Sequence, residues 1–319
     1  MVNVATFNAG SFLLLKFIKM ERVLITGGSG LIGRQLTARL QKEGYEVCWL
    51  TRSKTAAPGV TVFTWNPEKK FIPAEALTET DHVIHLAGAS VAWLWTSGYK
   101  RKILSSRIDT AQLIFDQMKI VPNKVKTFIS ASGIGYYGDG GDRWLDEKAP
   151  AGNDFLAKVC VKWEEAANSF MQLNKRVVIL RTGIVLAKEG GTLPPLILSM
   201  KFGIAPIFGN GRQFYSWIHI EDLCRMYLSA VKNETMRGVY NAVAPNPVSF
   251  KELVNEIGNV RGKKKINFPL PEFLMRLMLG GFGDTLLGGQ RCTSDKIQAE
   301  GFLWEHSDLR HAIENLLPN

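Results

Sequence analysis

Three regularly spaced glycines are the first residues whose pattern points to chemistry. They lie in the segment TGGSGLIG, residues 26–33, with the spacing Gly27-x-x-Gly30-x-x-Gly33. Gly27 permits a tight turn, Gly30 lets a phosphate approach the backbone, and Gly33 lets a helix pack closely on the preceding strand. The N–H groups and partial positive charge of a helix N-terminus favour an anion at the same place. The pattern therefore predicts a pyrophosphate-binding turn.

The end of the second strand-like run indicates which dinucleotide would fit such a turn. In an NAD site this position holds a carboxylate, which binds the ribose 2′-hydroxyl. This chain has Thr51, Arg52, Ser53 and Lys54 there instead. A guanidinium suits a 2′-phosphate, because it forms paired, charge-assisted hydrogen bonds. We therefore expect NADP rather than NAD, with Arg52 in contact and Arg34 beside it.

Small residues also follow the fourth strand-like run, in the segment HLAGA at residues 85–89. Such residues let a cofactor lie against the backbone, although an ordinary turn would use them too. The cofactor-binding residues expected from these three segments are Thr26, Gly27, Ser29, Gly30, Leu31, Ile32, Gly33, Thr51, Arg52, Leu86, Ala87 and Gly88.

The elements that must position these residues follow from the alternation of apolar runs with amphipathic stretches. That alternation predicts an α/β fold, a Rossmann-type doubly wound parallel sheet with helices on both faces and a small C-terminal substrate lobe. The expected strands are residues 23–26, 46–51, 60–65, 82–86, 125–130 and 176–181, and the expected helices include residues 34–42, 100–118 and 155–171.

The same pattern divides the chain into three parts. Residues 1–19 are expected to be an extension before the first run, with Met20 as an alternative start and a targeting segment as a second interpretation. Residues 20–185 are expected to form the NAD(P)-binding domain, to which later segments return. Prolines interrupt the pattern after about residue 185, so residues 186–319 are expected to form the smaller lobe.

Composition excludes several classes of protein. The chain has 319 residues, of which 46% are hydrophobic and 21% charged, as in ordinary globular proteins. No apolar run approaches the roughly 20 residues of a membrane-spanning helix. The formal net charge of +10 is scattered and forms no stripe, so no nucleic-acid partner is expected. The four cysteines form no CxxC pair, so we expect no metal site and a reducing, cytoplasmic setting.

Taken together, these segments resemble the extended short-chain dehydrogenase/reductase superfamily, in its nucleotide-sugar epimerase-like branch. TGGSGLIG matches its TGxxGxxG turn, and HLAGA matches its fourth-strand motif. Three further segments resemble its fifth-strand serine segment, its sixth-strand segment and its WIHxxD element, namely SASGIGYYG at 130–138, LRTGIVL at 180–186 and WIHIEDL at 217–223.

A narrower resemblance is to the "epimerase family" group, also labelled nucleoside-diphosphate-sugar epimerase or cell-division-inhibitor homologue. The segments SRI at 106–108, KWE at 162–164 and LLGGQR at 286–291 carry it. The resemblance covers the chain from about Met20 and implies a C-terminal domain of unknown function. It also adds Arg107 to the expected cofactor-binding residues.

The resemblance implies a catalytic Tyr-x-x-x-Lys pair on one helix and a serine on the fifth strand that orients the reacting oxygen. Ser132 is expected to be this serine, with Ser130 as the alternative. No tyrosine occurs between Gly138 and Phe170, however. The chain therefore departs from the family pattern at the residue that would move the proton.

Two registers remain open for the pair. One places Asp154 and Lys158 at its two positions, and the other places Lys158 and Lys162 there. Three interpretations of the lost tyrosine also remain. Another acid replaces it, with Tyr136, Tyr137 or Asp154 as candidates; or the reaction needs hydride transfer alone, with water or substrate supplying the proton; or the chain binds NADP without turnover.

Two residues of the second lobe are expected on the substrate side. By family analogy, Arg212 in the loop GNGRQF at 209–214 meets an anionic group, and His219 is a candidate acid or base with a structural histidine as the alternative. The expected function is an NADP-binding oxidoreductase or epimerase-like protein for a small polar substrate, nucleotide-linked substrates included. An NADP-binding regulatory or sensor module is the alternative, and a homodimer is one option for its assembly.

Overall fold

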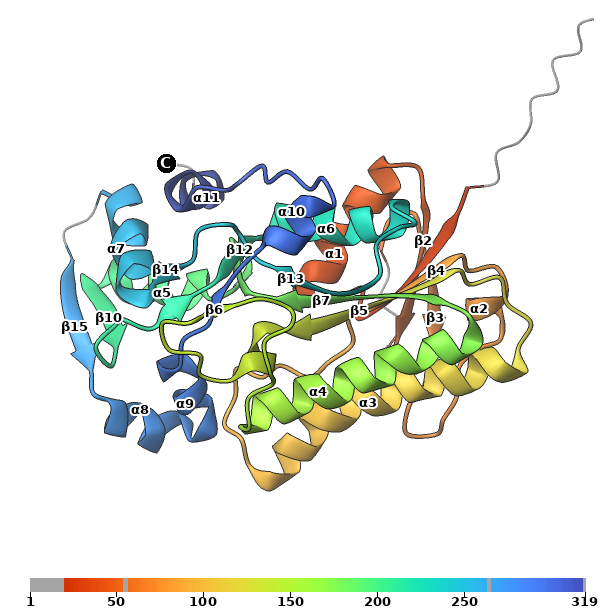
Figure 1. Ribbon diagram of the computed structural model, residues 1–319, viewed down its shortest axis with the longest axis horizontal. Coiled ribbons are helices and arrows are strands. Elements are labelled where there is room, and N and C mark those ends of the chain that lie inside the picture. Colours follow the sequence, from red (N-terminus) through yellow and green to blue (C-terminus); the bar gives the residue numbers. More distant parts are fainter. Residues whose placement is uncertain (1–19, 54–56, 263–264, 318–319) are drawn as a thin grey trace, which may run out of the picture.

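A parallel sheet of seven strands forms the centre of the protein, in the order β13-β7-β5-β4-β1-β2-β3 (Figure 1). The computed structural model describes residues 20–53, 57–262 and 265–317, so the expected extension and Lys54 lie outside the described residues. The strands are β1 (Arg22–Thr26), β2 (Glu46–Thr51), β3 (Val60–Thr64), β4 (His82–His85), β5 (Thr127–Gly133), β7 (Arg176–Thr182) and β13 (Gly238–Ala242). The strand order reverses direction beside β1, which confirms the doubly wound α/β fold.

Helices cover both faces of this sheet, as Figure 1 shows. On one face α1 (Leu31–Lys42) packs beside α6 (Ile220–Lys232), and on the other α3 (Ser97–Ile120) packs beside α4 (Phe155–Asn168). Alternate residues of a strand point to opposite faces. On β1, Val23 and Ile25 therefore join the core under α1, and Leu24 joins the core under α3. Covering both faces explains why the inner strands are almost wholly apolar.

The observed elements lie close to the expected ones, and the differences have local causes. The first helix begins at Leu31 rather than at residue 34, because Gly30 is already its N-cap. The last expected helix, 155–171, ends at Asn168 and continues as a 3-10 turn over Ser169–Leu173. Asn174 then takes a left-handed conformation with φ of 55°, which closes that turn before β7.

A smaller lobe follows β7, although α6 and β13 return to the large sheet. It holds a three-stranded sheet, two two-stranded pairs and several short helices. Its elements are β8 (Ile184–Ala187), β9 (Gly190–Gly191), α5 (Leu193–Lys201), β10 (Ile204–Phe208), β11 (Phe214–Tyr215), β12 (Trp217–His219), β14 (Val248–Ser249), α7 (Phe250–Val260), β15 (Ile266–Leu270), α8 (Glu272–Leu279), α9 (Gly281–Leu287), α10 (Asp295–Ala299) and α11 (Leu309–Leu316).

Short elements complete the chain, namely α2 (Glu75–Thr78), the 3-10 turn η1 (Ile134–Tyr137), β6 (Trp144–Leu145) and β16 (Arg291–Cys292). The last two pair with each other and join the C-terminal segment to the loop after β5. Within the described ranges, no helix combines the length and the apolar content that a membrane crossing requires.

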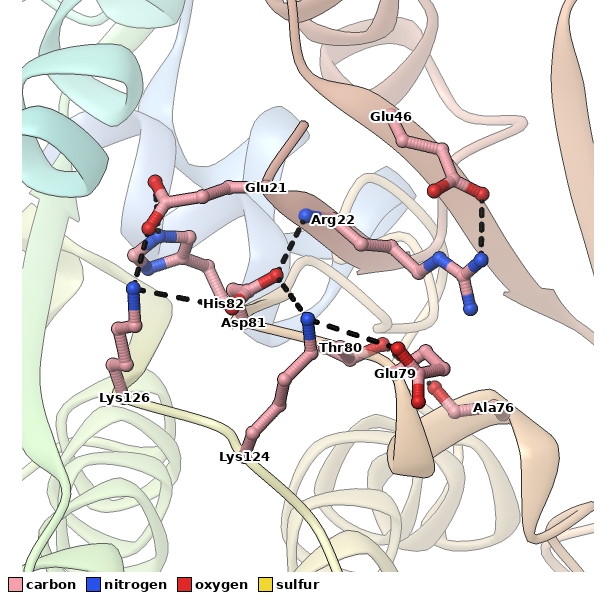
Figure 2. A network of polar contacts seen from close by, with 10 residues as sticks. All are labelled: Glu21, Arg22, Glu46, Ala76, Glu79, Thr80, Asp81, His82, Lys124 and Lys126. Atoms are coloured by element: carbon pink, nitrogen blue, oxygen red, sulfur yellow. Dashed lines mark hydrogen bonds and ion pairs between the residues drawn. The ribbon is translucent and has the colours of Figure 1, made fainter. Parts of the chain in front are cut away.

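Charged side chains hold the amino ends of the strands together (Figure 2). Asp81 accepts a hydrogen bond from the Arg22 backbone N–H at 2.9 Å and pairs with Lys124 at 3.0 Å. Burial tends to raise the pKa of Asp81, but the hydrogen bonds from Arg22 and Lys124 outweigh it and hold that pKa below its usual value. Glu21 pairs with Lys126 and lies 3.3 Å from His82 Nε2. This edge of the sheet is therefore closed by opposite charges.

Candidate functional site

The glycine turn joins β1 to α1 at the carboxyl edge of the sheet. Gly27 has a φ of +71°, and a Cβ on it would lie 3.1 Å from the backbone N of Ala87. A Cβ on Gly33 would lie 2.5 Å from the Gly27 carbonyl oxygen, so the first turn of α1 needs glycine there. A Cβ on Gly30 would come within 4 Å of the Gly27 oxygen alone, at 3.2 Å, among the described residues. Gly30 therefore faces open space at the start of α1.

Neighbouring elements fix the turn from two sides. The Thr26 hydroxyl accepts a hydrogen bond from Ala87 N–H at 3.1 Å, and the Thr26 carbonyl accepts one from Leu86 N–H at 3.1 Å. From the smaller lobe, β9 approaches α1, because a Cβ on Gly190 would lie 3.1 Å from the Leu31 side chain. The expected residues of the first and fourth strands thus meet in one place.

Arg107 of α3 lies directly beside the end of β4. A Cβ on Gly88 would lie 2.9 Å from Arg107 Cζ, so a larger residue there would require the guanidinium to shift. The backbone N–H of Ala89, the next residue, donates a hydrogen bond to Ser106 Oγ at 2.8 Å. These contacts tie α3 to the same edge of the sheet as the glycine turn.

The second-strand residues lie at the rim of this site. Arg52 is exposed after β2, and the Thr51 hydroxyl donates to the Ser53 carbonyl. Arg34 is exposed as well, and its Nη1 donates to the Ser29 carbonyl at 2.7 Å, which holds the guanidinium beside the glycine turn. The Arg34 guanidinium therefore lies next to the glycine turn without filling it.

Ser132, near the carboxyl end of β5, belongs to a buried polar network. Its hydroxyl donates to Glu164 Oε1 at 2.7 Å, and Arg181 donates to both Glu164 oxygens at 2.9 Å. Arg181 also donates to the Tyr137 hydroxyl at 3.0 Å, and that hydroxyl donates to Asn241 Oδ1 at 2.7 Å. An ionised carboxylate only accepts hydrogen bonds. The Ser132 proton is therefore directed at Glu164, which leaves the serine oxygen able to accept.

Sequence reasoning did not assign Glu164, Arg181 or Asn241 to the site. The available signal was a charged residue inside an apolar run, Arg181 in RVVILRT. A charge in a buried strand needs a partner. That partner is Glu164, which lies in the segment KWE at 162–164.

The three candidate acids occupy different environments. Tyr137 is buried, its hydroxyl is engaged, and burial raises its pKa. Asp154 is the N-cap of α4, where its carboxylate accepts from Ala157 N–H at 2.8 Å. Tyr136 is half-buried, and the Arg181 guanidinium lies 3.3 Å from the centre of its ring. Of the three, Tyr136 alone combines partial exposure with a hydroxyl that makes no hydrogen bond to the described residues.

The two candidate lysines lie on the outer side of α4. Lys158 and Lys162 are both exposed, and the side of α4 that faces Ser132 carries Cys160 and Glu164. Burial raises the pKa of the Cys160 thiol to about 11, so it is neutral near pH 7. The structure therefore brings Ser132 together with a thiol and a carboxylate, and not with either lysine.

The two expected substrate residues, Arg212 and His219, also differ in how far they are exposed to solvent. Arg212 is exposed in a loop whose turn is made by its N–H donating to Asn210 Oδ1 at 2.8 Å. His219 is fully buried as the N-cap of α6, and its Nδ1 accepts from Glu221 N–H at 3.2 Å. Burial, and then the neighbouring His306, lower the pKa of His219 to about 4.

His219, Glu221 and His306 also raise the question of a metal, because their ligand-type atoms lie within 4.8 Å of one another. Since His219 Nδ1 accepts a hydrogen bond, the neutral ring carries its proton on Nε2. A metal-binding histidine shows the reverse, with its second nitrogen donating. We therefore assign no metal to this group.

Family profiles match two parts of the chain. Residues 23–242 match the NAD dependent epimerase/dehydratase family, and residues 270–316 match a domain of unknown function, DUF1731. The expected resemblance, with its C-terminal domain, is confirmed.

Relatives and solved structures agree with these profiles. An epimerase family protein of Mycobacterium leprae is 35% identical over 297 residues, which cover 91% of this chain and 94% of that protein. The chloroplastic SDR39U1 homologue of Arabidopsis thaliana is 31% identical over 308 residues, covering 92% and 86%. The crystal structure of human epimerase family protein SDR39U1 with NADPH has a TM-score of 0.82 at 28% identity, covering 92% of this chain and 98% of that one. The chain therefore belongs to the NAD-dependent epimerase/dehydratase family.

Proposed function

We propose that this chain binds NADP(H) at the glycine turn and acts as an oxidoreductase or epimerase-like enzyme on a small polar substrate, with nucleotide-linked substrates included. The observation that carries the proposal is the open backbone at Gly30, where the helix N–H groups of α1 begin. A Cβ there would stand in the space that a pyrophosphate needs. A bound nicotinamide supplies or takes up a hydride. The residues present therefore fit a dinucleotide.

Preference for NADP is part of the proposal. Arg52 follows β2 where an NAD site carries a carboxylate, and Arg34 is held beside the turn by its bond to Ser29. Human SDR39U1, at 28% identity, is in complex with NADPH. A 2′-phosphate at this rim would meet two exposed guanidinium groups, whereas a 2′-hydroxyl would find no carboxylate in the segment Thr51–Ser53.

The remaining site residues have proposed roles of their own. Ser132 orients the reacting oxygen, accepting a hydrogen bond from it while its own proton points to Glu164. Arg212 meets an anionic group of the substrate. His219, buried at the N-cap of α6, stays a prediction as an acid or base on the substrate side. Lys158 and Lys162 stay predictions as ligands of the nicotinamide ribose.

A second candidate function is an NADP-binding regulatory module with little turnover. Two observations favour it. The residues of α4 include no tyrosine, and the hydroxyl of Tyr137 is fixed between Arg181 and Asn241. Losing the paired acid removes a contribution typically worth about 10²–10⁴-fold in rate. We therefore expect slow turnover of common nucleotide sugars, or none.

Calorimetric titration of the full chain with NADPH and with NADH tests the cofactor. We expect NADPH to bind at least about 10-fold tighter, a difference of about 1.4 kcal/mol. Equal affinities would reject the preference, and no binding of either would reject the proposed function.

Turnover is tested by following NADPH consumption, or epimerisation, with a panel of nucleotide sugars. If turnover is found, Ser132→Ala should lower kcat more than it weakens NADPH binding, as expected for a contact made mainly in the transition state. Lys158→Met and Lys162→Met distinguish the two registers, since only a lysine that contacts the ribose should weaken cofactor binding. Brisk turnover indifferent to all three variants would show that these assignments are wrong.

A further inference from the structure

Apolar side chains are exposed together at one end of the protein, where α8 meets the loop between β4 and α3. On α8, Phe273 is 71% exposed and Leu277 is 78% exposed. In the loop, Trp93 is 66% exposed and Leu94 is 51% exposed. The two groups are neighbours, because a Cβ on Gly280, the C-cap of α8, would lie 3.6 Å from Leu94 Cδ1. The apolar end surface, as we call it, consists of Trp93, Leu94, Phe273 and Leu277.

The helix α8 exposes apolar residues on the side where a surface helix normally carries polar ones. Met275 is buried and faces the protein. Phe273 and Leu277 are four residues apart, so they share one side of the helix, and that side is opposite Met275. Contiguous exposed apolar residues mark sites that contact another protein or a membrane. The outward side of α8 therefore has the character of a contact surface.

Aromatic contacts hold the loop between β4 and α3 in place. The Trp95 ring packs on Phe155 at the start of α4 and on Phe282 of α9, with ring centres 5.1 and 6.1 Å apart. The Trp95 Nε1 also donates a hydrogen bond to a carbonyl of the same loop at 2.8 Å. Trp93 and Leu94 therefore project from a loop whose base is anchored to both lobes.

Three cations border the apolar end surface. Lys100, Arg101 and Lys102 lie in the first turns of α3, directly after the loop. The Lys100 Nζ lies 5.2 Å from the centre of the Phe155 ring, on which Trp95 packs. Among the described residues, no Asp or Glu forms an ion pair with any of the three cations. Their charges are therefore available to a partner.

The charge at this end of the protein is positive on balance. Arg276 pairs with Glu272 at 3.5 Å and with Asp284 at 2.8 Å, which leaves one negative charge on α8 and α9 together. The three cations of α3 outnumber that charge. Figure 1 shows α8, α9 and the start of α3 along the same side of the molecule. The partner that this side fits therefore combines apolar groups with negative charge.

An anionic bilayer surface offers both properties at once. Tryptophan and leucine side chains enter the boundary between headgroups and acyl chains, and lysine and arginine bind the anionic headgroups. Protein interfaces instead place their apolar anchors in well-packed pockets, whereas Trp93 and Leu277 are both more than half exposed. A second copy of this chain would bring two sets of cations together, because a two-fold contact uses the same surface on both copies. The charge therefore favours the bilayer.

We propose that the apolar end surface docks the protein on an anionic membrane. The four apolar side chains enter the headgroup boundary, and the cations at the start of α3 bind lipid phosphates. Docking of this kind needs no membrane-spanning helix. The inference does not rest on the proposed function, because none of its residues is assigned to the cofactor or the substrate.

The test is co-sedimentation of the full chain with vesicles of phosphatidylcholine that contain about 30% phosphatidylglycerol, beside vesicles of phosphatidylcholine alone. We expect binding to the anionic vesicles, weakened by added salt because salt screens the charges. Trp93→Ser combined with Leu277→Ser should lower the affinity at least about 10-fold, since less apolar area then leaves water. Arg101→Gln combined with Lys102→Gln should lower it at least about 10-fold, since each cation near an anionic surface contributes about 5-fold.

The matched controls lie at the other end of α3. Lys119→Gln removes an exposed cation, and Ile120→Ser removes an apolar side chain that is 76% exposed. Neither change should alter vesicle binding, because both residues lie far along the helix from the apolar end surface. Circular dichroism shows whether each variant is folded.

Several outcomes would overturn the inference. One is a chain that does not bind the anionic vesicles, and another is vesicle binding that the two double variants retain. A dimer in size-exclusion chromatography that Trp93→Ser with Leu277→Ser dissociates would assign the surface to a second copy instead. If that variant does not fold, the double variant of Arg101 and Lys102 decides, because it changes exposed side chains only: unchanged vesicle affinity then rejects the proposal.

Discussion

The two edges of the large sheet differ in whether their charged side chains are paired. At the amino edge, Asp81 and Glu21 are matched by Lys124 and Lys126, and the contacts close the ends of the strands (Figure 2). At the carboxyl edge, glycine and alanine leave open backbone, and the buried cation of Arg107 has no described carboxylate beside it. One edge is complete without a ligand, and the other has room and charge for an anion.

This difference indicates which edge of the sheet can bind an anionic ligand. Both edges are rich in charge, so counting charged residues would not separate them. The distinguishing feature is whether each charge has a partner within the protein. An unpaired buried charge lowers the free energy of unfolding, and a bound ligand of opposite charge raises it again. Variants at the two edges should therefore change different quantities, stability at the amino edge and affinity at the open part of the carboxyl edge.

The largest expected effect is on the paired arginine. Arg181→Met leaves the Glu164 carboxylate buried without its partner, and we expect a loss of about 3–5 kcal/mol in the free energy of unfolding. Urea denaturation measures it. Adding Glu164→Gln removes the orphaned charge and should recover part of the loss. A single variant as stable as the unmodified chain would contradict the assignment of this pair as structural.

At the open edge, Gly30→Val should abolish dinucleotide binding. Its side chain enters the space left for the pyrophosphate, and we expect affinity for NADPH to fall at least about 100-fold, about 2.7 kcal/mol. The fold should persist, because among the described residues that Cβ meets only the Gly27 oxygen within 4 Å. Calorimetry gives the affinity and circular dichroism serves as the control. Normal NADPH binding by a natively folded variant would place the site elsewhere.

At the closed edge, Asp81→Asn should reduce stability by about 2 kcal/mol, since it weakens hydrogen bonds that involve charged groups. NADPH affinity should not change. The measurement is thermal or urea unfolding beside a cofactor titration. A variant that keeps its stability but loses NADPH binding would erase the distinction between the two edges.

The same residue predicts a pH dependence with a definite sign. The folded-state pKa of Asp81 is lowered, so its contribution is fully present above the unfolded pKa of about 3.9 and is lost as the pH falls through the lower folded value. Unfolding free energy of the unmodified chain should therefore decline across this acid range. Asp81→Asn should show a flatter profile there, and parallel profiles would exclude Asp81 as the source.

The smallest expected effect is at the rim. Arg52→Asp should erase or reverse the preference for NADPH, a change of about 10-fold or 1.4 kcal/mol, because Arg52 is exposed and its charge is screened by solvent. NADH affinity should stay the same or rise, and stability should be unaffected. The ratio of the two affinities is the measured quantity. An undiminished NADPH preference would transfer the 2′-phosphate contact to Arg34 alone.

Much of the fold could be predicted from the sequence, because its signals are local. Each strand of the large sheet expected from an apolar run was observed within a few residues, and the glycine turn lies between β1 and α1 as its spacing indicated. The return of β13 to the sheet edge was foreseen only in general terms, since the run Gly238–Ala242 is short and lies within the proline-broken part of the chain. Pairing of that strand with β7 depends on contacts between segments far apart in the sequence.

In the candidate site, too, the features with local signals could be predicted and those that depend on distant segments could not. The glycine turn could be predicted because the regular spacing of Gly27, Gly30 and Gly33 encodes it. The environment of Ser132 was not, because Glu164 lies 32 residues away and Asn241 lies 104 residues from Tyr137. The lysine registers were drawn from spacing along one helix, and spacing alone does not tell which side of α4 faces the sheet.

The sequence by itself determined the family, the doubly wound order of strands and helices, and the place of the glycine turn, since hydrophobic period and glycine spacing act over a few residues. Only the tertiary structure decided which charges have partners. Arg107 and Arg181 are alike as residues, yet one meets Glu164 across two elements and the other meets Trp163 and open backbone. The energy of a charge depends on what lies within a few ångströms of it, and that neighbourhood is set by packing rather than by position along the chain.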